Sequence, residues 1–418
     1  MDVELVTIGD ELLLGFTVDT NAAHLARELA SIGIGIPRRS TVGDVAEDIA
    51  AVVRDAIERT GAVITTGGLG PTSDDLTKPS IAELFGRGMR LDEEHVAWME
   101  ARWQQRFHRR MPESNRAQAM LPEGATKLVN RHGSAPGIWL EDERGRWVAM
   151  LPGVPREMKG MLADTLLPIL RSRSATGKAT VVRSSTLRTT GVAESLLADQ
   201  IDPIKERLGP VSLAYLPGAD GVDLRLTIRG VSSDAADATL AEAASVLRER
   251  LGRSIYAEGD TDLASVILDR CRELRHTIAV AESCTGGLLG ARLTSIPGSS
   301  DVVLGGIIAY SNDVKRDLLG VEEQSLATQG AVSEMVVREM AEGARSRARA
   351  TIGIAITGIA GPGGGTPEKP IGTVWIAAAL ADGTRTLQLR LIGDREEIRR
   401  RATQSSLELV RRTLLEHD

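Results

Sequence analysis

The chain has 418 residues, of which 26% are charged and 42% are hydrophobic, and its net charge is −7 at pH 7. This length predicts two or three domains, and the composition excludes a disordered or fibrous protein. No apolar stretch is long enough to span a bilayer, and the acidic N-terminus MDVELVTIGDELLLG lacks the basic start of a signal peptide, so we expect a cytoplasmic protein without a membrane partner.

The composition also bears on partners and cofactors. A negative net charge offers no overall field for nucleic acid, and only 3% of the residues are aromatic, which disfavours a base-stacking platform. Nucleic acid is therefore not an expected partner. Cys271 and Cys284 are the only cysteines, so we expect neither a disulfide framework nor a thiolate zinc site.

The first segment of the chain alternates strand and helix patterns. Strand-like runs and apolar runs at helical spacing follow one another at 3–9, 21–33, 47–61, 62–68 and 147–170. This rhythm predicts a doubly wound, mostly parallel α/β sheet in an N-terminal domain of residues 1–171. In such a sheet ligands gather at the carboxyl ends of the strands.

The pattern changes after the small polar stretch RSRSATGK, residues 171–178. From about 179 to 255 the chain follows a strand, helix, strand, strand, helix order, with a hairpin around the PGADG turn at 217–221. We expect a small α+β domain at 172–257. Strand and helix alternation resumes in the last segment, which predicts a third, α/β domain at 258–418.

A glycine-rich loop, TTGGLGPTSDD at 65–75, follows a buried strand of the first domain. Glycines let the backbone approach a ligand and turn its N–H groups inward, and carboxylates can hold a metal or a sugar hydroxyl. The candidate nucleotide-binding residues are Gly67, Gly68, Gly70, Asp74 and Asp75, and the two aspartates are also the candidate metal ligands. Alternatively, one of these carboxylates caps the helix that follows.

Three motifs of this segment carry a resemblance. GDELLLG at 9–15, TTGGLGPTSDDLT at 65–77 and LPGVPREM at 151–158 resemble the molybdopterin-binding-like domain of the CinA family of competence/damage-inducible proteins. The resemblance implies a pocket for a pterin or a nucleotide, and a metal-dependent hydrolysis of the pyrophosphate in ADP-ribose. The loop chemistry fits both ligands.

The motif AESCTGG at 281–287 places a serine beside a cysteine, between an apolar strand pattern and a helical pattern. A nucleophilic serine needs a base. His276 lies at the far end of the same predicted strand, and His417 lies in a predicted terminal helix, so a histidine base is not expected. The next candidates are Lys315 and Tyr310 in YSNDVK, although these residues also fit an edge aromatic and a solvated helix lysine.

Two further segments surround this serine. Thr285, Gly286 and Gly287 fall at a predicted helix N-terminus, where free N–H groups can stabilise an oxyanion or a phosphate. A second small-residue loop, ITGIAGPGGGTPEKPIG at 356–372, can close over the same site. Arg395 and Arg399 of GDREEIRRRA share one helical face and suit a phosphate, although exposed helical arginines are common.

The motifs AESCTGG, AYSNDVK, ITGIAGPGGGTPEKPIGTV and GDREEIR resemble, in this order, the C-terminal domain of the CinA family, which also occurs alone as the PncC-type nicotinamide mononucleotide deamidase. The middle unit resembles the family's KH-like insert. The resemblance implies Ser283 as the nucleophile, with Lys315 and Tyr310 as base and relay. The residues that it places around the substrate are Thr285, Gly286, Gly287, Thr357 and Gly358.

The expected function is therefore hydrolysis of nicotinamide mononucleotide to nicotinic acid mononucleotide and ammonia, without a cofactor, by an amidohydrolase domain. A second, divalent-metal-dependent activity on ADP-ribose is expected in the first domain, and the family resemblance implies a homodimer. Cys284 is expected to be a small buried residue. The alternative is a nucleotide- or pterin-binding regulatory protein linked to competence, without turnover in the first domain.

Overall fold

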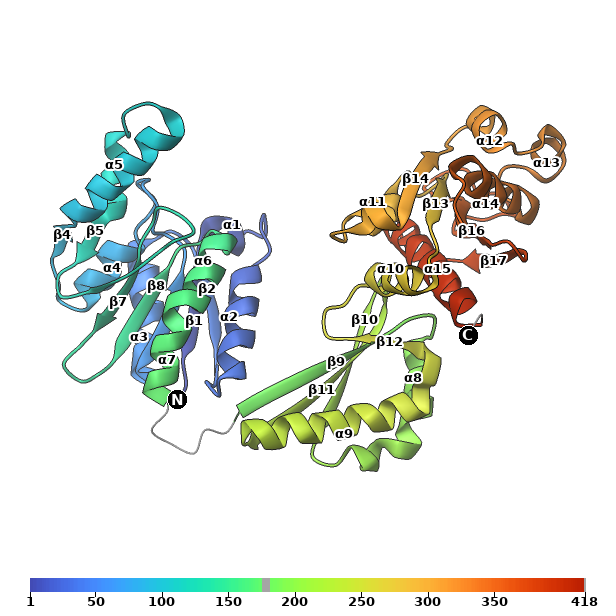
Figure 1. Ribbon diagram of the computed structural model, residues 1–418. Helices are drawn as coiled ribbons and strands as arrows, with labels where there is room; N and C mark the ends of the chain where they lie inside the picture. The colour runs from blue at the N-terminus through green and yellow to red at the C-terminus, as the bar shows by residue number, and fades with distance from the viewer. Residues whose placement is uncertain (175–180, 417–418) are drawn as a thin grey trace. The chain divides into compact units, whose positions relative to one another are not determined.

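The computed structural model describes residues 1–174 and 181–416. These residues form two compact units, 1–183 with 228–238 and 184–227 with 239–418, and each is considered by itself (Figure 1). Arg171 to Ser174 of the small polar stretch at 171–178 form the end of a helix, and its remainder lies outside the described residues, as does His417. The predicted domain boundaries stay predictions.

The first unit is built on a six-stranded sheet in the order β2-β1-β3-β8-β7-β6. Strands β2, β1, β3 and β8 are parallel, β7 pairs antiparallel with β8, and β6 pairs antiparallel with β7. The six strands are β1 (Glu4–Ile8), β2 (Arg39–Val42), β3 (Ala62–Thr66), β6 (Thr126–Leu128), β7 (Gly137–Glu141) and β8 (Trp147–Leu151). A separate two-stranded ribbon pairs β4 (Met89–Leu91) with β5 (Met120–Pro122).

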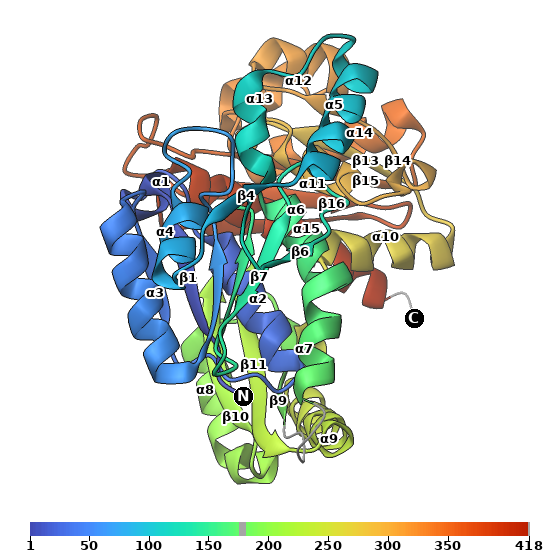
Figure 2. The same ribbon diagram turned by 90° about the vertical axis from the view of Figure 1, so that its left-hand side faces the viewer.

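Helices cover both faces of this sheet (Figure 2). The helices of the unit are α1 (Asp10–Leu13), α2 (Thr20–Ser31), α3 (Ala46–Thr60), α4 (Thr77–Leu84), α5 (Glu93–Phe107), α6 (Pro155–Met161) and α7 (Leu167–Ser174). Apolar residues of α2, α6 and α7 pack on one face, and those of α3 and α4 pack on the other. The predicted doubly wound α/β sheet is confirmed, whereas the sequence did not predict the ribbon and α5.

The middle segment carries a four-stranded sheet in the order β10-β11-β9-β12. Its elements are β9 (Val181–Thr189), α8 (Glu194–Ile201), β10 (Ser212–Gly218), β11 (Gly221–Val231), α9 (Ser233–Leu251) and β12 (Ile255–Glu258). The predicted order and the hairpin at 217–221 are confirmed. The last strand, β12, is an addition that pairs antiparallel with β9.

The last segment has a five-stranded sheet in the order β14-β13-β15-β16-β17. Its elements are α10 (Leu263–Leu274), β13 (Ile278–Glu282), α11 (Leu288–Thr294), β14 (Val303–Ile308), α12 (Asn312–Leu319), α13 (Glu323–Gln329), α14 (Glu334–Ala348), β15 (Ile352–Gly358), β16 (Thr373–Ala379), β17 (Thr384–Arg390) and α15 (Arg395–Leu415). Helices α10, α11 and α15 share one apolar core, and α14 shares the other. The predicted α/β fold of the last segment is confirmed.

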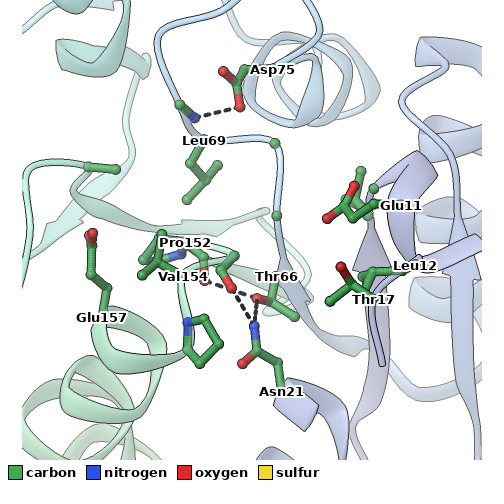
Figure 3. Close-up of a pocket in the computed structure, with 18 of the residues that line it drawn as sticks. Glu11, Leu12, Thr17, Asn21, Thr66, Leu69, Asp75, Pro152, Val154 and Glu157 are labelled. Carbon is green, nitrogen blue, oxygen red and sulfur yellow. Dashed lines mark hydrogen bonds between the residues drawn. The ribbon is translucent and has the colours of Figure 1, made fainter. Parts of the chain in front are cut away.

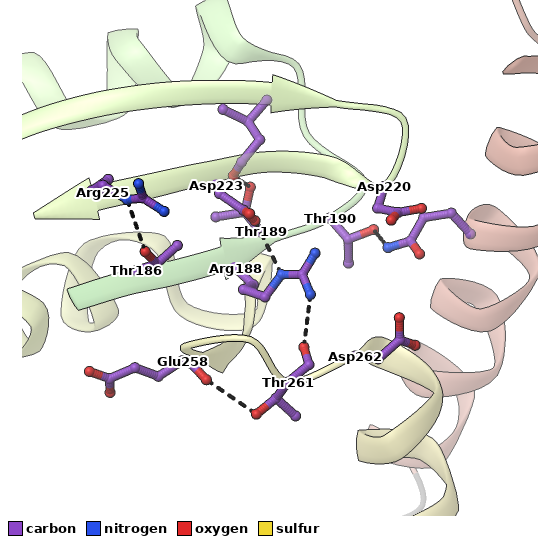
Figure 4. A network of polar contacts seen from close by, with 12 residues as sticks. Thr186, Arg188, Thr189, Thr190, Asp220, Asp223, Arg225, Glu258, Thr261 and Asp262 are labelled. Atoms are coloured by element: carbon purple, nitrogen blue, oxygen red, sulfur yellow. Dashed lines mark hydrogen bonds and ion pairs between the residues drawn. The ribbon is translucent and has the colours of Figure 1, made fainter. Parts of the chain in front are cut away.

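Polar contacts connect the middle sheet with the last segment inside the second unit (Figure 4). Arg188 of β9 donates to Asp223 of β11 at 3.3 Å and to the Thr261 carbonyl at 3.1 Å. Gln404 of α15 donates to Thr190 at 3.0 Å. The first bond lies within the middle sheet, and the second joins this sheet to the loop before α10. The third joins the residue after β9 to α15, so it links the small sheet to the C-terminal helix. In the part of the chain that the structure describes, no helix is both long and apolar enough to cross a membrane.

Candidate functional site

Three strand ends gather at one edge of the C-terminal sheet. Strand β13 ends at Glu282, and it pairs in parallel with β14 and β15, which end at Ile308 and Gly358. Parallel strands present their carboxyl ends at the same edge. The residue that follows β13 is Ser283, whereas His276 precedes this strand by two residues and therefore lies at the other edge.

Lys315 of α12 reaches Ser283 across this edge. Its Nζ lies 3.1 Å from Ser283 Oγ, 2.8 Å from the Ala309 carbonyl oxygen and 3.5 Å from the Tyr310 carbonyl oxygen. Helix α12 starts where it does because the Ser311 side chain accepts the Val314 N–H. This cap aims Lys315, one turn into the helix, back at the strand ends.

The surroundings of Lys315 favour its neutral form. The side chain is 1% exposed, and no carboxylate in the described chain forms an ion pair with it. Burial lowers the pKa of its ammonium group, because the charged form is desolvated. A neutral amine within hydrogen-bond distance of a serine hydroxyl has the geometry of a general base. The alternative of a solvated helix lysine is wrong.

Cys284 lies in the hydrophobic core that α11 and α15 share with the sheet. Burial raises the pKa of its thiol to about 11, so the thiol stays protonated near neutral pH and is a poor nucleophile. The side chain that reaches the strand edge is therefore that of Ser283.

Glu282 is a residue of this site that the sequence did not single out. Its carboxylate is 1% exposed and accepts the N–H groups of Gly287 at 3.0 Å, Leu289 at 3.1 Å and Gly290 at 2.7 Å. An acid one residue before a candidate nucleophile, followed by a glycine pair and a helix, is the pattern that could have revealed it. These three bonds fasten the turn that carries Ser283.

The expectation that the N–H groups of Gly286 and Gly287 are free at the helix N-terminus is wrong. Gly287 donates to Glu282, and Gly286 donates to the Ser283 carbonyl at 3.1 Å, so neither N–H is free to stabilise an oxyanion. In the turn after Ser283, the Cys284 N–H interacts with its own thiol, and the Thr285 N–H has no backbone acceptor among the described residues. Of the predicted residues Thr285, Gly286 and Gly287, only Thr285 therefore keeps a donor without a backbone partner.

Arg395 and Arg399 enter the same region from the first turns of α15. Arg399 donates to the Thr285 carbonyl at 2.6 Å, and Arg395 donates to the Gly361 carbonyl at 2.7 Å. The second guanidinium nitrogen of Arg395 donates to the Tyr310 hydroxyl at 2.9 Å. The Tyr310 hydroxyl is therefore hydrogen-bonded to Arg395, and the part of Tyr310 that lies near Lys315 is its backbone carbonyl.

Thr357 and Gly358 end β15 at this edge and have structural contacts of their own. The Thr357 hydroxyl donates to the Ala331 carbonyl at 2.8 Å. A Cβ at Gly358 would come within 2.7 Å of the Val374 side chain, so a larger residue would not fit there. Both residues shape the edge, and their predicted contacts with a substrate stay a prediction.

A second candidate site lies at the carboxyl ends of β1, β3 and β8 in the first unit. The cavity there has a volume of about 550 Å³ and is lined by Gly67, Gly68 and Gly70, and we call it the glycine cavity. At its floor, Asn21 donates to the Gly153 carbonyl at 2.7 Å, and Thr66 donates to the Pro152 carbonyl at 3.0 Å (Figure 3). Asn21 and Thr66 were not predicted as site residues, although Thr66 belongs to the motif TTGGLGPTSDD and Asn21 begins the helical run 21–33.

The glycine loop owes its shape to two local features. Gly67 has a φ of 112°, and a Cβ there would lie 2.0 Å from the Ile8 carbonyl oxygen, so only glycine fits. Asp75 accepts the N–H groups of Gly70 at 2.6 Å and Thr72 at 2.7 Å, and it also accepts the Thr72 hydroxyl. Asp75 therefore closes the loop.

The expected alternative that Asp74 or Asp75 caps the helix after the glycine loop is wrong. Helix α4 has Leu76 at its N-cap, and no side chain makes a capping hydrogen bond there. Neither Asp74 nor Asp75 caps this helix. Both aspartates line the cavity. Asp75 is held by three hydrogen bonds within the loop, whereas a hydrogen bond from Thr72 lowers the pKa of the exposed Asp74.

Other carboxylates face the glycine cavity. Glu11 and Asp44 line it together with Asp74. Burial raises the pKa of Asp44, and the neighbouring charges of Asp10, Glu11 and Asp74 raise it further. Within residues 1–174 and 181–416, no three metal-binding side chains lie close enough to form a complete site. Mg²⁺ commonly uses one or two carboxylates and completes its shell with water and phosphate oxygens, so the donor set fits such an ion.

Three family models match the chain. They are the "Probable molybdopterin binding domain" at residues 4–172, the "Damage-inducible protein CinA KH domain" at 184–257 and the "CinA C-terminal domain" at 260–414. Together they follow the order in which the three sheets occur along the chain.

Similar proteins match over almost the full length. A CinA-like protein of Gemmatimonas aurantiaca is 61% identical over 99% of this chain and 96% of its own, and a CinA-like protein of Salinibacter ruber is 43% identical over 99% and 100%. The crystal structure of competence/damage inducible protein CihA from Agrobacterium tumefaciens matches with 44% identity over 37% of this chain and 93% of that one, with a TM-score of 0.36. The chain belongs to the CinA family of competence/damage-inducible proteins.

Proposed function

We propose that the C-terminal domain hydrolyses the carboxamide of nicotinamide mononucleotide to the acid and ammonia. The observation that carries this proposal is the pair of Ser283 and the buried Lys315, whose side chains meet at 3.1 Å. A serine hydroxyl beside a lysine whose pKa is lowered by burial can pass its proton to that lysine, so the attack on an acyl carbon needs no histidine. The family resemblance supplies the substrate.

The reaction has two stages. Ser283 Oγ attacks the carboxamide carbon while Lys315 Nζ takes the hydroxyl proton, and the tetrahedral intermediate collapses as Lys315 returns that proton to the leaving nitrogen, which departs as ammonia. Water then attacks the acyl-serine ester, again giving its proton to Lys315. Collapse of the second intermediate restores Ser283 and releases the carboxylic acid.

The turn after Ser283 offers a donor for the charge on the carboxamide oxygen. The Thr285 N–H has no backbone acceptor in the described residues, and losing one such donor typically costs about 3 kcal/mol of transition-state stabilisation. Glu282 supports this donor indirectly, because it anchors the other end of the same turn.

The nucleotide's phosphate would bind near the first turn of α15. Arg395 and Arg399 bring two positive charges to the edge of the site, and the Tyr310 hydroxyl shares Arg395. We therefore assign Tyr310 to substrate binding through Arg395, and Lys315 alone to proton transfer.

The test is incubation of the purified full chain with nicotinamide mononucleotide, followed by ammonia measurement and mass identification of the product. Release of nicotinic acid mononucleotide that disappears in Ser283→Ala supports the assignment. Undiminished turnover in that variant would rule it out.

A second activity is proposed for the first unit, namely hydrolysis of the pyrophosphate of ADP-ribose. The glycine cavity offers a loop for phosphate oxygens, and Glu11, Asp44 and Asp74 offer oxygen donors for a divalent cation. When bound, such a cation would neutralise phosphate charge. The Gly67 and Gly70 N–H groups already donate to the Leu151 carbonyl and to Asp75. This chain would therefore contribute the N–H groups of Gly68 and Leu69 between them, together with the carboxylates that hold the ion.

The competing proposal is a regulatory module that binds a nucleotide or a pterin in the glycine cavity without turnover. The same incubation with ADP-ribose, with and without Mg²⁺, separates the two. Products that contain AMP and ribose 5-phosphate support the hydrolase, and calorimetric binding without products supports the regulatory module.

A further inference from the structure

We propose that a second cavity in the first unit binds the planar aromatic base of a ligand whose phosphates occupy the glycine cavity. This cavity has a volume of about 400 Å³, and we call it the α5 cavity. Its wall is formed by Trp98, Arg102, Trp103, Arg106 and Phe107 of α5, and by Arg156 of α6. This cavity would be the base site of the proposed pyrophosphatase, so the inference rests on the proposed hydrolysis of ADP-ribose.

The α5 cavity adjoins the glycine cavity. The two share Ser134, Val154 and Glu157 as lining residues. Figure 3 shows Glu157 across the glycine cavity from Glu11 and Thr17. A ligand with phosphates at the glycine loop therefore reaches the α5 cavity by extending toward Glu157, away from the carboxylate of Glu11.

The lining of the α5 cavity has the chemistry of a base site. The chain has only five tryptophans and three phenylalanines, yet two of the tryptophans and one phenylalanine meet here, with Trp98 39% and Phe107 43% exposed. The Arg102 guanidinium lies 5.3 Å from the Trp98 ring centroid, and that of Arg106 lies 5.3 Å from the Phe107 ring centroid. Rings layered with guanidinium groups are surfaces on which nucleobases stack.

The charge of the α5 cavity also fits a phosphate-linked ligand. Its lining holds three arginines and one carboxylate, that of Glu157, although the chain as a whole carries a net charge of −7. A purely apolar occupant, such as a hydrophobic peptide, would leave these arginines without a partner. A base attached to a phosphate uses both the rings and the cations.

The test compares AMP with ribose 5-phosphate, which lacks the base, by calorimetric titration of the full chain. We expect AMP to bind at least about tenfold more tightly, and we expect Trp98→Ala or Arg102→Gln to remove most of this preference. Trp98→Phe keeps the ring and should keep the preference. Arg110→Gln removes an exposed arginine outside the lining and serves as the charge control. The binding of ribose 5-phosphate should stay within twofold in all four variants.

The outcomes separate this proposal from the proposed activity. A preference for AMP that depends on Trp98, in a protein that does not hydrolyse ADP-ribose, supports the base site and rejects the pyrophosphatase. Equal binding of the two ligands, or a preference that survives both Trp98→Ala and Arg102→Gln, overturns the base site even if ADP-ribose is hydrolysed. Self-association lost in these two variants, without a preference for AMP, would make the α5 cavity a protein interface instead.

Discussion

Lys315 Nζ lies 3.1 Å from Ser283 Oγ, although 32 positions separate the two residues in the chain. The lysine comes from α12 and the serine from the end of β13, and the parallel pairing of β13 with β14 brings both to one edge of the sheet. The proposed attack by Ser283 and the proton transfer to Lys315 both depend on this pairing, because it brings the two side chains together.

The first prediction concerns the two adjacent candidate nucleophiles. Ser283→Ala should lower kcat for nicotinamide mononucleotide by at least about 10³-fold, because the acyl-enzyme cannot form. Cys284→Ala should change kcat by less than about tenfold, since the buried thiol is protonated and does not reach the substrate. Ammonia release measures both, and a larger loss in the cysteine variant would contradict the assignment.

The second prediction concerns the pH dependence of the amidase. Lys315 must be neutral to accept a proton, and burial lowers its pKa below the usual 10.5. The rate should therefore rise with pH as the ammonium loses its proton, and level off above a pKa lower than 10.5. A profile of kcat/KM against pH gives this value. Lys315→Arg stays charged and should be inactive at every pH, so activity in that variant at high pH would argue against lysine as the base.

The third prediction concerns Glu282. Glu282→Gln removes the negative charge that accepts three N–H groups, so the turn loses its anchor and kcat should fall about 10–100-fold while KM changes little. The matched control is Glu408→Gln. Glu408 is a second buried carboxylate of this domain, and it accepts hydrogen bonds from Arg411 and Arg412.

The control variant should lose stability but keep its activity. Removing the charge of Glu408 leaves Arg411 buried without a counter-charge, which typically costs about 3–5 kcal/mol of unfolding free energy. Denaturant unfolding measures this loss, and kcat of the folded protein should remain unchanged. Equal losses of kcat in both variants would mean that Glu282 acts only through stability.

The fourth prediction separates binding from proton transfer. Tyr310→Phe removes the hydroxyl that pairs with Arg395, so KM should rise by up to about tenfold while kcat stays within a few-fold of the parent value. Arg395→Gln should raise KM more strongly. Steady-state kinetics with nicotinamide mononucleotide decide the point, and a collapse of kcat in Tyr310→Phe would restore tyrosine as a proton relay.

The fifth prediction concerns the divalent cation of the first unit. The raised pKa of Asp44 means that its carboxyl group holds a proton at a higher pH than an exposed aspartate does, so Mn²⁺ affinity should weaken as the pH falls through that value. Asp44→Asn should weaken Mn²⁺ binding at least tenfold, as measured by calorimetry.

The comparison variant is Asp75→Asn, which loosens the glycine loop and should impair ADP-ribose hydrolysis with less effect on Mn²⁺ binding. The reverse pattern would make Asp75 the metal ligand.

Local patterns were enough to predict the layers of the fold. Buried strands such as 62–66 and amphipathic helices such as 46–60 have a period that appears within a single window of residues. The PGADG turn of the middle sheet was equally local. The α5 insertion was not predicted, because its apolar residues pack on a small separate core rather than on the main sheet.

The sequence by itself determined which residues could carry the chemistry: a serine at a strand end, few histidines, a lysine shortly after the next strand and a glycine loop with two aspartates. The tertiary structure decided which of their atoms meet. Lys315 contacts Ser283, and the Tyr310 hydroxyl accepts a hydrogen bond from Arg395. Asp75 accepts N–H groups of the glycine loop, and Glu282 accepts N–H groups at the N-terminus of α11. The reason is physical, because hydrogen bonds and burial depend on distances between segments, and strand pairing and helix packing set these distances.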